Sequence, residues 1–362
     1  MERSIIGVVG TGTMGAGIAQ VALENGHEVV LHDVDDAATE RGRARIRDGL
    51  ARRAERMGLD ADSIDDWVAG RLANLREGYS LDAVGAEAGI VIEAALEDLE
   101  LKQTIFRALD AAAGPDVMLA TNTSALSVGA IAAAAARPRR VLGLHFFNPA
   151  PVMELVEVVA TPRADPAVVE RAATLMTAWG KTPVRCADRP GFIVNRVNRP
   201  FTLDALRMLE AGIASVEAID AALREAGFPL GPFELIDFAG VDINLAASRG
   251  VWDGLGRPDR LRPSVLLDRL VAEGRLGRKS GRGFYRYHDG RRGPVEPEFA
   301  GGPTSLTAEA IRIPILAAIE TEARVALAEG VATAGDIDLA MRLGAGHPSG
   351  PFERAAAPTI DR

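Results

Sequence analysis

The sequence is poor in cysteine, because Cys186 is the single one among 362 residues, so no intrachain disulfide can form. A lone cysteine fits a reducing compartment. No apolar run reaches the roughly 18 residues of a membrane-spanning helix, so none is expected. The first residues enter a strand pattern directly, without the apolar segment and cleavage site of a signal peptide. Together these features predict a cytoplasmic protein.

Basic residues are also in deficit: 41 lysines and arginines face 50 aspartates and glutamates, which gives a net charge of −9. This balance argues against nucleic acid or an anionic membrane as the main partner, although a local basic patch could still bind an anionic substrate. The shares of hydrophobic (48%) and charged (25%) residues are typical of a soluble globular protein, and the length predicts two or three domains.

The N-terminal half alternates short apolar runs with helical patterns. Its first unit combines a strand over residues 4–9, a helix over 16–25 that ends at Gly26, and a strand over 27–32. The charged stretch that follows is mostly helical in pattern. Further strands are expected over residues 89–93, 117–121 and 141–147, with a helix over 98–113. The alternation predicts an α/β fold with a doubly wound parallel sheet up to about residue 185.

After residue 188 the pattern changes to successive helices, so we expect one domain over residues 1–188 and a second region that is all-α. That region repeats itself. E-A-G-I-A-S at 210–215 and A-I-D-A-A-L-R at 218–224 return 118 residues later as A-E-G-V-A-T (328–333) and D-I-D-L-A-M-R (336–342), and G-F-P-L-G-P-F-E at 227–234 returns as G-H-P-S-G-P-F-E at 346–353. A stretch rich in Gly and Pro over residues 288–304 is interpreted as a linker. The sequence therefore predicts two tandem helical copies, over residues 189–288 and, in shortened form, 305–362.

A glycine fingerprint follows the first strand and opens the first helix. Gly10 permits a tight turn, Gly12 lets a pyrophosphate approach the backbone, and Gly15 lets the helix pack closely, with Thr13 and Met14 between them. The helix N-terminus then offers N–H groups to the phosphates. Asp33 ends the second strand, where a carboxylate accepts from a ribose 2′-hydroxyl, so NAD is favoured over NADP. The alternative is a glycine-rich turn beside an ordinary surface aspartate.

Ionisable side chains interrupt the apolar stretch G-L-H-F-F-N-P-A-P-V-M-E-L-V-E-V-V at 143–159. Its prolines force the strands to break, so the two runs can lie near each other. Glu157 lies deeper in the second run than Glu154 and would be costly to bury unpaired. A buried carboxylate beside His145 would form an acid–base pair able to take a proton from a substrate hydroxyl. The alternative is a structural histidine that the turn backbone satisfies.

Six motifs stand in order along the chain: G-V-V-G-T-G-T-M-G-A-G-I-A-Q (7–20), T-N-T-S-A-L-S (121–127), L-H-F-F-N-P-A-P-V-M-E-L-V-E-V-V (144–159), R-P-G-F-I-V-N-R-V (189–197), G-F-P-L-G-P-F-E-L-I-D (227–237) and G-R-K-S-G-R-G-F-Y-R-Y (277–287). They resemble those of the L-3-hydroxyacyl-CoA dehydrogenase family, which includes 3-hydroxybutyryl-CoA dehydrogenases and part of the bacterial fatty-acid oxidation multienzymes. The resemblance implies a Rossmann domain, NAD, an acyl-CoA substrate and the oxidation of 3-hydroxyacyl-CoA in fatty acid metabolism, with no metal.

The resemblance also implies roles for individual residues. His145 matches the catalytic base and Glu157 the carboxylate that orients it, while Ser124 and Asn195 match residues that hold the substrate. Ser124 could otherwise be a helix N-cap. Asn148 matches a neighbour of the active site, and Glu97 and Lys102 match residues near the nicotinamide. The resemblance also implies that Arg52, Arg53 and Arg56 form a patch for the CoA phosphates; the alternative for this patch is a solvated helix face.

The second helical copy resembles the tandem arrangement of the multienzymes. Aligning the copies places Ile313 opposite Asn195 and Pro314 opposite Arg196, so copy two should be a packing partner rather than a second site. The expected state is a monomer with an internal pseudo-dimer, or a homodimer. Two other functions stay open: a dehydrogenase of hydroxy acids that needs no CoA, and a non-catalytic NAD-binding protein of the same fold.

Overall fold

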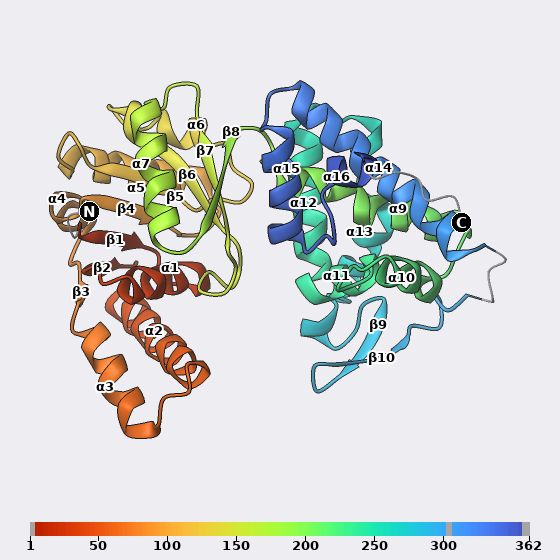
Figure 1. Cartoon of the computed structure of the whole chain (residues 1–362), viewed down its shortest axis with the longest axis horizontal. Helices are drawn as coiled ribbons and strands as arrows, with labels where there is room; N and C mark the ends of the chain where they lie inside the picture. The colour runs from red at the N-terminus through yellow and green to blue at the C-terminus, as the bar shows by residue number, and fades with distance from the viewer. Residues whose placement is uncertain (1–3, 302–305, 357–362) are drawn as a thin grey trace. The chain divides into compact units, whose positions relative to one another are not determined.

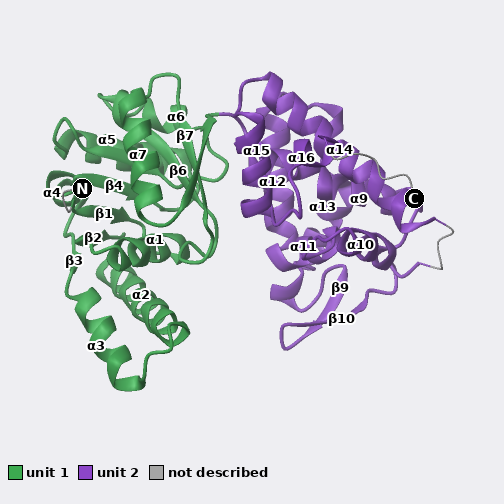
Figure 2. Ribbon diagram, in the orientation of Figure 1, with its two compact units in different colours: residues 1–188 green, residues 189–362 purple. Residues whose placement is uncertain are grey.

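The computed structural model describes residues 4–301 and 306–356. The chain forms two compact units, residues 1–188 and 189–362 (Figure 2). Residue 305 and residues 357–362 of the expected second helical copy lie outside the described residues. Across the described ranges, the helices are all too short or too polar to cross a membrane.

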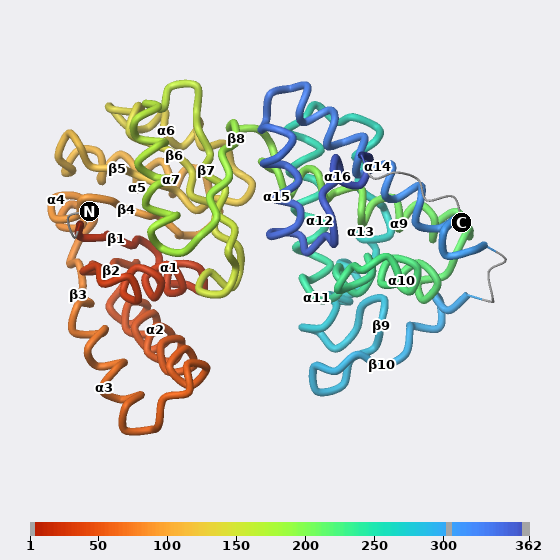
Figure 3. Tube along the Cα trace, in the orientation of Figure 1, coloured from red at the N-terminus to blue at the C-terminus, as the bar shows by residue number. Residues whose placement is uncertain are grey.

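An eight-stranded sheet in the order β3-β2-β1-β4-β5-β6-β7-β8 organises the first unit (Figure 1). All neighbouring strands are parallel except β6 and β7. The chain runs outward from β1 to β3, then starts again at β4 on the other side of β1 (Figure 3), which is the predicted Rossmann arrangement. The strands are β1 (Ile6–Val9), β2 (Val29–His32), β3 (Leu75–Glu77), β4 (Ile90–Glu93), β5 (Met118–Thr121), β6 (Val141–Phe146), β7 (Leu155–Ala160) and β8 (Thr182–Ala187).

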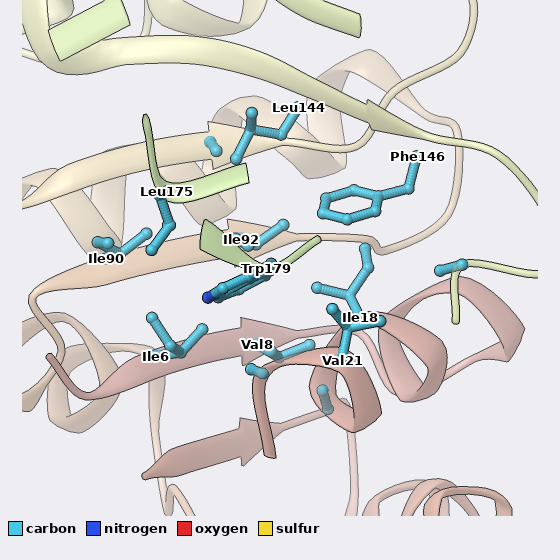
Figure 4. Close-up of a cluster of buried hydrophobic side chains, with 14 of the residues drawn as sticks. Ile6, Val8, Ile18, Val21, Ile90, Ile92, Leu144, Phe146, Leu175 and Trp179 are labelled. Carbon is cyan, nitrogen blue, oxygen red and sulfur yellow. The ribbon is translucent and has the colours of Figure 1, made fainter. Parts of the chain in front are cut away.

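Helices cover both faces of this sheet, which is why its central strands are apolar on both sides. On one face, Ile18 and Val21 of α1 and Leu175 of α7 pack over β1, β4 and β6 (Figure 4). On the other face, the core includes residues of α4, α5 and α6. The helices are α1 (Thr13–Glu24), α2 (Asp36–Arg56), α3 (Ala61–Leu72), α4 (Leu81–Glu87), α5 (Leu99–Ala112), α6 (Val128–Ala132) and α7 (Pro166–Ala178), with a 3₁₀ turn at Pro138–Arg140.

The Pro-rich turn joins β6 to β7 as the sequence predicts. The Asn148–Pro149 peptide bond is cis. The Lys181 ammonium donates to the carbonyl oxygens of Ala150 (2.7 Å) and Met153 (2.9 Å), so the turn is tied to the start of β8. Because β7 returns antiparallel to β6, residues of the two runs face each other directly across the ladder.

The second unit is helical, with one departure from the expected pattern. Its helices are α8 (Val194–Val197), α9 (Arg199–Glu210), α10 (Val216–Glu225), α11 (Pro232–Ala239), α12 (Val241–Gly254), α13 (Val265–Ala272), α14 (Ala308–Ala328), α15 (Ala334–Ala345) and α16 (Pro351–Ala356), with 3₁₀ turns at Asp259–Leu261 and Arg278–Ser280.

The departure is a β-hairpin made of β9 (Tyr285–His288) and β10 (Arg291–Val295). The expectation of a structureless linker over 288–304 is wrong for this part. His288 pairs with Arg291 around the two-residue loop Asp289-Gly290, whose φ angles are 49° and 71°. Asp-Gly is a strong signal for such a turn, because both residues tolerate positive φ.

The two repeated motifs have the same hydrogen bonds. The Asp220 carboxylate accepts from the N–H groups of Phe233 (2.9 Å) and Glu234 (3.1 Å), and so caps α11. In the later motif, the carboxylate of Asp338 accepts from the N–H groups of two residues of α16, Phe352 (2.8 Å) and Glu353 (3.1 Å). The likeness in sequence therefore extends to the geometry of the helix caps.

The repeated motifs also meet each other reciprocally. A Cβ atom on Gly227 would lie 3.1 Å from Pro348, and one on Gly346 would lie 3.1 Å from Pro229. Gly227 aligns with Gly346 and Pro229 with Pro348, so the two contacts are the same contact made twice. This exchange is typical of an isologous interface with two-fold symmetry.

Candidate active site

The phosphate-binding fingerprint lies between β1 and α1. A Cβ on Gly15 would lie 1.8 Å from the carbonyl oxygen of Gly10, and one on Gly10 would lie 2.7 Å from the backbone of Ala94. Packing therefore requires both glycines. Gly12 differs, because its Cβ would meet no described atom within 4 Å. Its missing side chain leaves room outside the protein, where a pyrophosphate would lie.

The first turn of α1 is available to an anion. The helix begins at Thr13, and its N-cap residue, Gly12, provides no side-chain hydrogen bond. Thr13 is exposed and Met14 is half-buried. The N-terminal N–H groups and the positive end of the helix dipole thus point out of the turn toward the space above Gly12. These features fit a dinucleotide.

Asp33 follows β2 and is fixed by the fingerprint loop. Its carboxylate accepts from the N–H (2.6 Å) and hydroxyl (2.7 Å) of Thr11 and from the N–H of Val34 (2.7 Å). Burial alone would raise the pKa of Asp33, but these hydrogen bonds outweigh it and lower the pKa. A charged carboxylate is therefore held next to the fingerprint, where it suits a ribose and opposes a 2′-phosphate.

Glu97 and Lys102 belong to a network of charged groups that starts at the end of β4. Lys102 is 1% exposed, and its ammonium lies 2.6 Å from a carboxylate oxygen of the fully buried Glu93 and 3.5 Å from Glu97. Glu93 also accepts from the Thr121 hydroxyl (2.7 Å), which links β4 to β5. Lys102 thus connects a buried carboxylate to the partly exposed carboxylate of Glu97.

The Glu97 carboxylate in turn holds the loop that follows β5. It accepts from the Thr123 hydroxyl (2.6 Å) and from the N–H groups of Ser124 (2.8 Å) and Ala125 (2.9 Å). Burial acts to raise the pKa of Glu97, but Thr123, Lys102 and the two N–H groups together lower it. Ser124 is exposed and its hydroxyl lies 3.3 Å from Glu97, so this serine belongs to the loop rather than to a helix N-cap.

His145 and Glu157 face each other across β6 and β7. They are register partners, and Nδ1 of His145 lies 2.6 Å from a carboxylate oxygen of Glu157. The exposed fraction of the side chain is 7% for His145 and zero for Glu157. A buried carboxylate that accepts from one imidazole nitrogen fixes the tautomer and stabilises the charged ring. The arrangement has the form of an acid–base pair.

The sequence reasoning missed two polar residues beside these groups. Glu93 was assigned only to a strand, although a carboxylate that ends a buried apolar run is a signal of pairing. The amide oxygen of Asn122 accepts from the N–H of Phe146 (2.8 Å), which ties the end of β5 to the end of β6 next to His145. Both residues lie at the carboxyl edge of the sheet, where α/β folds place ligands.

The remaining candidates lie elsewhere. Asn148 is exposed in the turn after β6, and Arg52, Arg53 and Arg56 are exposed on α2, where Arg53 lies 3.8 Å from Glu24. Asn195 lies on α8 in the second unit, next to the fully buried Arg196. The structure brings together Gly10, Gly12, Thr13, Met14, Gly15 and Asp33 as one group, Glu97, Lys102 and Ser124 as a second, and His145 with Glu157 as a third.

Comparison with protein families identifies both units. The NAD-binding domain of 3-hydroxyacyl-CoA dehydrogenase matches residues 5–189. The C-terminal domain of 3-hydroxyacyl-CoA dehydrogenase matches residues 191–287 and 314–361.

Individual proteins agree with these matches. The chain is 46% identical over 291 residues to 3-hydroxyadipyl-CoA dehydrogenase of Escherichia coli, covering 80% of this chain but 60% of that protein. It is 41% identical over 283 residues to the human mitochondrial hydroxyacyl-coenzyme A dehydrogenase, covering 77% of this chain and 90% of that one. Among solved structures, 3-hydroxybutyryl-CoA dehydrogenase of E. coli K12 has a TM-score of 0.88 at 36% identity, covering 98% of this chain and 92% of that one.

Proposed function

Because the chain belongs to the 3-hydroxyacyl-CoA dehydrogenase family, we propose that it catalyses the reversible, NAD-dependent oxidation of (S)-3-hydroxyacyl-CoA to 3-oxoacyl-CoA. The observation that carries this proposal is the buried pair of His145 and Glu157 at 2.6 Å. It lies in the same sheet as a glycine fingerprint and a charged Asp33, and these fit NAD.

His145 acts as the general base in this proposal. Its Nδ1–H donates to the Glu157 carboxylate, so Nε2 is the nitrogen that takes the proton of the substrate 3-hydroxyl. As the O–H bond breaks, the carbonyl forms at C3 and the hydrogen on C3 leaves with its electron pair. Glu157 stabilises the imidazolium that results, and in the reverse direction the imidazolium returns its proton to the alkoxide oxygen.

NAD, when bound, supplies the acceptor for that hydride. We assign its pyrophosphate to Gly10, Gly12, Thr13, Met14 and Gly15, and its ribose to Asp33. Glu97 and Lys102 are assigned to the nicotinamide end. Lys102 is held by Glu93, so both groups are anchored to the end of β4.

We assign contact with the 3-oxygen of the acyl-CoA substrate to Ser124, whose N–H and hydroxyl donate to the Glu97 carboxylate. A further substrate contact is assigned to Asn195. Asn148 lies two residues beyond the end of β6 and is assigned as a neighbour of the site. Arg52, Arg53 and Arg56 offer exposed positive charge to the CoA phosphates.

We propose further that the chain works as a monomer in which the two helical copies form an internal pseudo-dimer, instead of a homodimer. The matching caps by Asp220 and Asp338 support this arrangement. The reciprocal contacts of Gly227 with Pro348 and of Gly346 with Pro229 support it independently.

The test of the proposed reaction is the variant His145→Gln, assayed by NADH consumption with acetoacetyl-CoA. General acid–base catalysis contributes about 10²–10⁴-fold, so we expect kcat to fall by that factor with little change in the affinity for NADH. His288→Gln, at an exposed histidine of the β9–β10 hairpin, is the matched control and should keep wild-type rates.

Other outcomes identify the alternatives. Turnover of free acetoacetate at rates equal to those with acetoacetyl-CoA would indicate a dehydrogenase of hydroxy acids that needs no CoA. A wild-type protein that binds NADH but turns over neither substrate would indicate a non-catalytic protein. Wild-type kcat in His145→Gln would show that His145 is not the base.

A further inference from the structure

The residue after Asn195 is a buried cation. Arg196 has no exposed surface, and its guanidinium makes two charge-assisted hydrogen bonds. Nε lies 2.7 Å from a carboxylate oxygen of Glu322, and Nη1 lies 2.7 Å from Glu329. A guanidinium removed from water requires such partners, because the charge is otherwise uncompensated.

Both partners come from the second helical copy. Glu322 lies on α14, and Glu329 is the C-cap residue of that helix. They stand 126 and 133 positions after Arg196 in the sequence. Glu322 is 1% exposed and also accepts from Arg260 of copy one at 2.6 Å. One buried carboxylate thus joins two arginines of copy one, and the segment of α8 that carries Asn195 is held from the other copy.

This ionic cluster is not repeated with the roles of the two copies exchanged. Alignment of the copies places Pro314 opposite Arg196, so copy two has no arginine at the matching position. Asp204 stands opposite Glu322 and pairs with Arg207 of its own helix at 2.9 Å. Ala211 stands opposite Glu329 and has no charge. The Gly–Pro contacts obey the pseudo-two-fold symmetry, whereas this ionic cluster breaks it.

We propose that the second copy is a positioning part of the active site, in which Glu322 and Glu329 hold Arg196 and thereby set the orientation of Asn195. The proposal rests on the substrate contact assigned above to Asn195. It extends the role of copy two beyond that of a packing partner, because it gives two residues of this copy an effect on turnover.

The test uses Glu322→Gln in the full-length protein, which keeps the size of the side chain and removes its charge. Misplacement of a substrate-holding group by about 1 Å costs on the order of 10²-fold in rate, so we expect kcat/KM for acetoacetyl-CoA to fall by about 10- to 100-fold. The affinity for NADH, which the first unit binds, should not change. Glu329→Gln, at a half-exposed residue, should fold even if Glu322→Gln does not, and should show a smaller loss of the same kind.

The matched control is Glu320→Gln, which removes an ion pair with Arg324 on the same helix, α14, and leaves Arg196 untouched. It should keep wild-type kinetics. A double-mutant cycle with Asn195→Ala distinguishes a merely structural role of Glu322 from a positioning role that acts through Asn195. If Glu322 acts through Asn195, then Glu322→Gln should lower kcat/KM of the wild type but not that of Asn195→Ala.

Two results would overturn the inference. One is a wild-type kcat/KM in a folded Glu322→Gln or Glu329→Gln protein while Asn195→Ala is impaired. The other is an equal loss from Glu322→Gln in both backgrounds. A fully active Asn195→Ala protein would instead refute the substrate contact assigned to Asn195, and the inference would fall with it.

Discussion

The substitution His347→Phe tests the contact between the two helical copies through its response to pH. His347 aligns with Phe228, and the two rings meet edge to face with centroids 4.8 Å apart. Nε2 of His347 lies 2.8 Å from the amide oxygen of Asn198, so this nitrogen carries the hydrogen. Phenylalanine would restore the residue of the other copy and remove the titrating group, together with one hydrogen bond.

The magnitude follows from the environment of the ring. Burial, with a smaller contribution from Arg354, lowers the pKa of His347 from 6.5 to about 3. The unfolded chain therefore binds a proton between these values while the folded chain does not, so stability falls as the pH drops below about 6.5. At roughly 1.4 kcal/mol per pH unit, the loss attributable to His347 is about 2 kcal/mol at about pH 5 and negligible at about pH 7.5.

The assay is urea unfolding of both proteins followed by circular dichroism, at about pH 7.5 and about pH 5. The variant loses the hydrogen bond to Asn198 at both pH values, so the free energy of this bond cancels when the pH-induced changes in stability of the two proteins are compared. We expect the variant to gain about 2 kcal/mol relative to the wild type on going to the lower pH. If the two proteins lose stability in parallel over this range, His347 is not held neutral in the folded state and the reasoning is refuted.

Two further predictions concern the catalytic pair and the second copy. Glu157→Gln keeps a hydrogen-bond acceptor opposite His145 but removes its charge. A hydrogen bond to a charged group contributes about 1.5–3 kcal/mol, so kcat should fall by about 10- to 150-fold. An unchanged kcat in a steady-state assay would contradict the role of the His145–Glu157 pair. Truncation after Ala300, just beyond the β9–β10 hairpin, removes α14 to α16 and should cause self-association or aggregation in size-exclusion chromatography, whereas a monomeric and fully active product would show that copy two covers nothing essential.

The central strands of the first unit could be predicted because their signals are local. The apolar runs that became β1, β4, β5 and β6 are buried on both faces and differ from the predicted ranges by one or two residues at their ends. The strand β8 gave no such signal, because it contains Pro183 and the exposed Arg185. Both are tolerated since β8 is the edge strand of the sheet, and only the tertiary fold shows that.

The candidate site likewise has one part that local sequence signals indicate and another that depends on the tertiary fold. A carboxylate inside an apolar run next to a proline turn indicated that Glu157 is buried and paired and that its run can lie near that of His145. The antiparallel return that makes the two residues direct partners is seen only in the fold. The pairing of Glu93 with Lys102 could not be predicted in the same way. It requires the end of β4 and the first turns of α5 to meet, and α5 has a second basic residue, Arg107, that spacing alone does not exclude.

The internal pseudo-dimer proposed above would let the two helical copies differ where the subunits of a homodimer could not. In a symmetric dimer, every substitution at an isologous interface occurs twice, so a histidine in place of Phe228 would face another histidine across the axis. In a tandem pair it occurs once, and His347 meets Phe228 instead. In the same way, the role proposed for Glu322 needs an arginine only in copy one, where Arg196 stands beside Asn195.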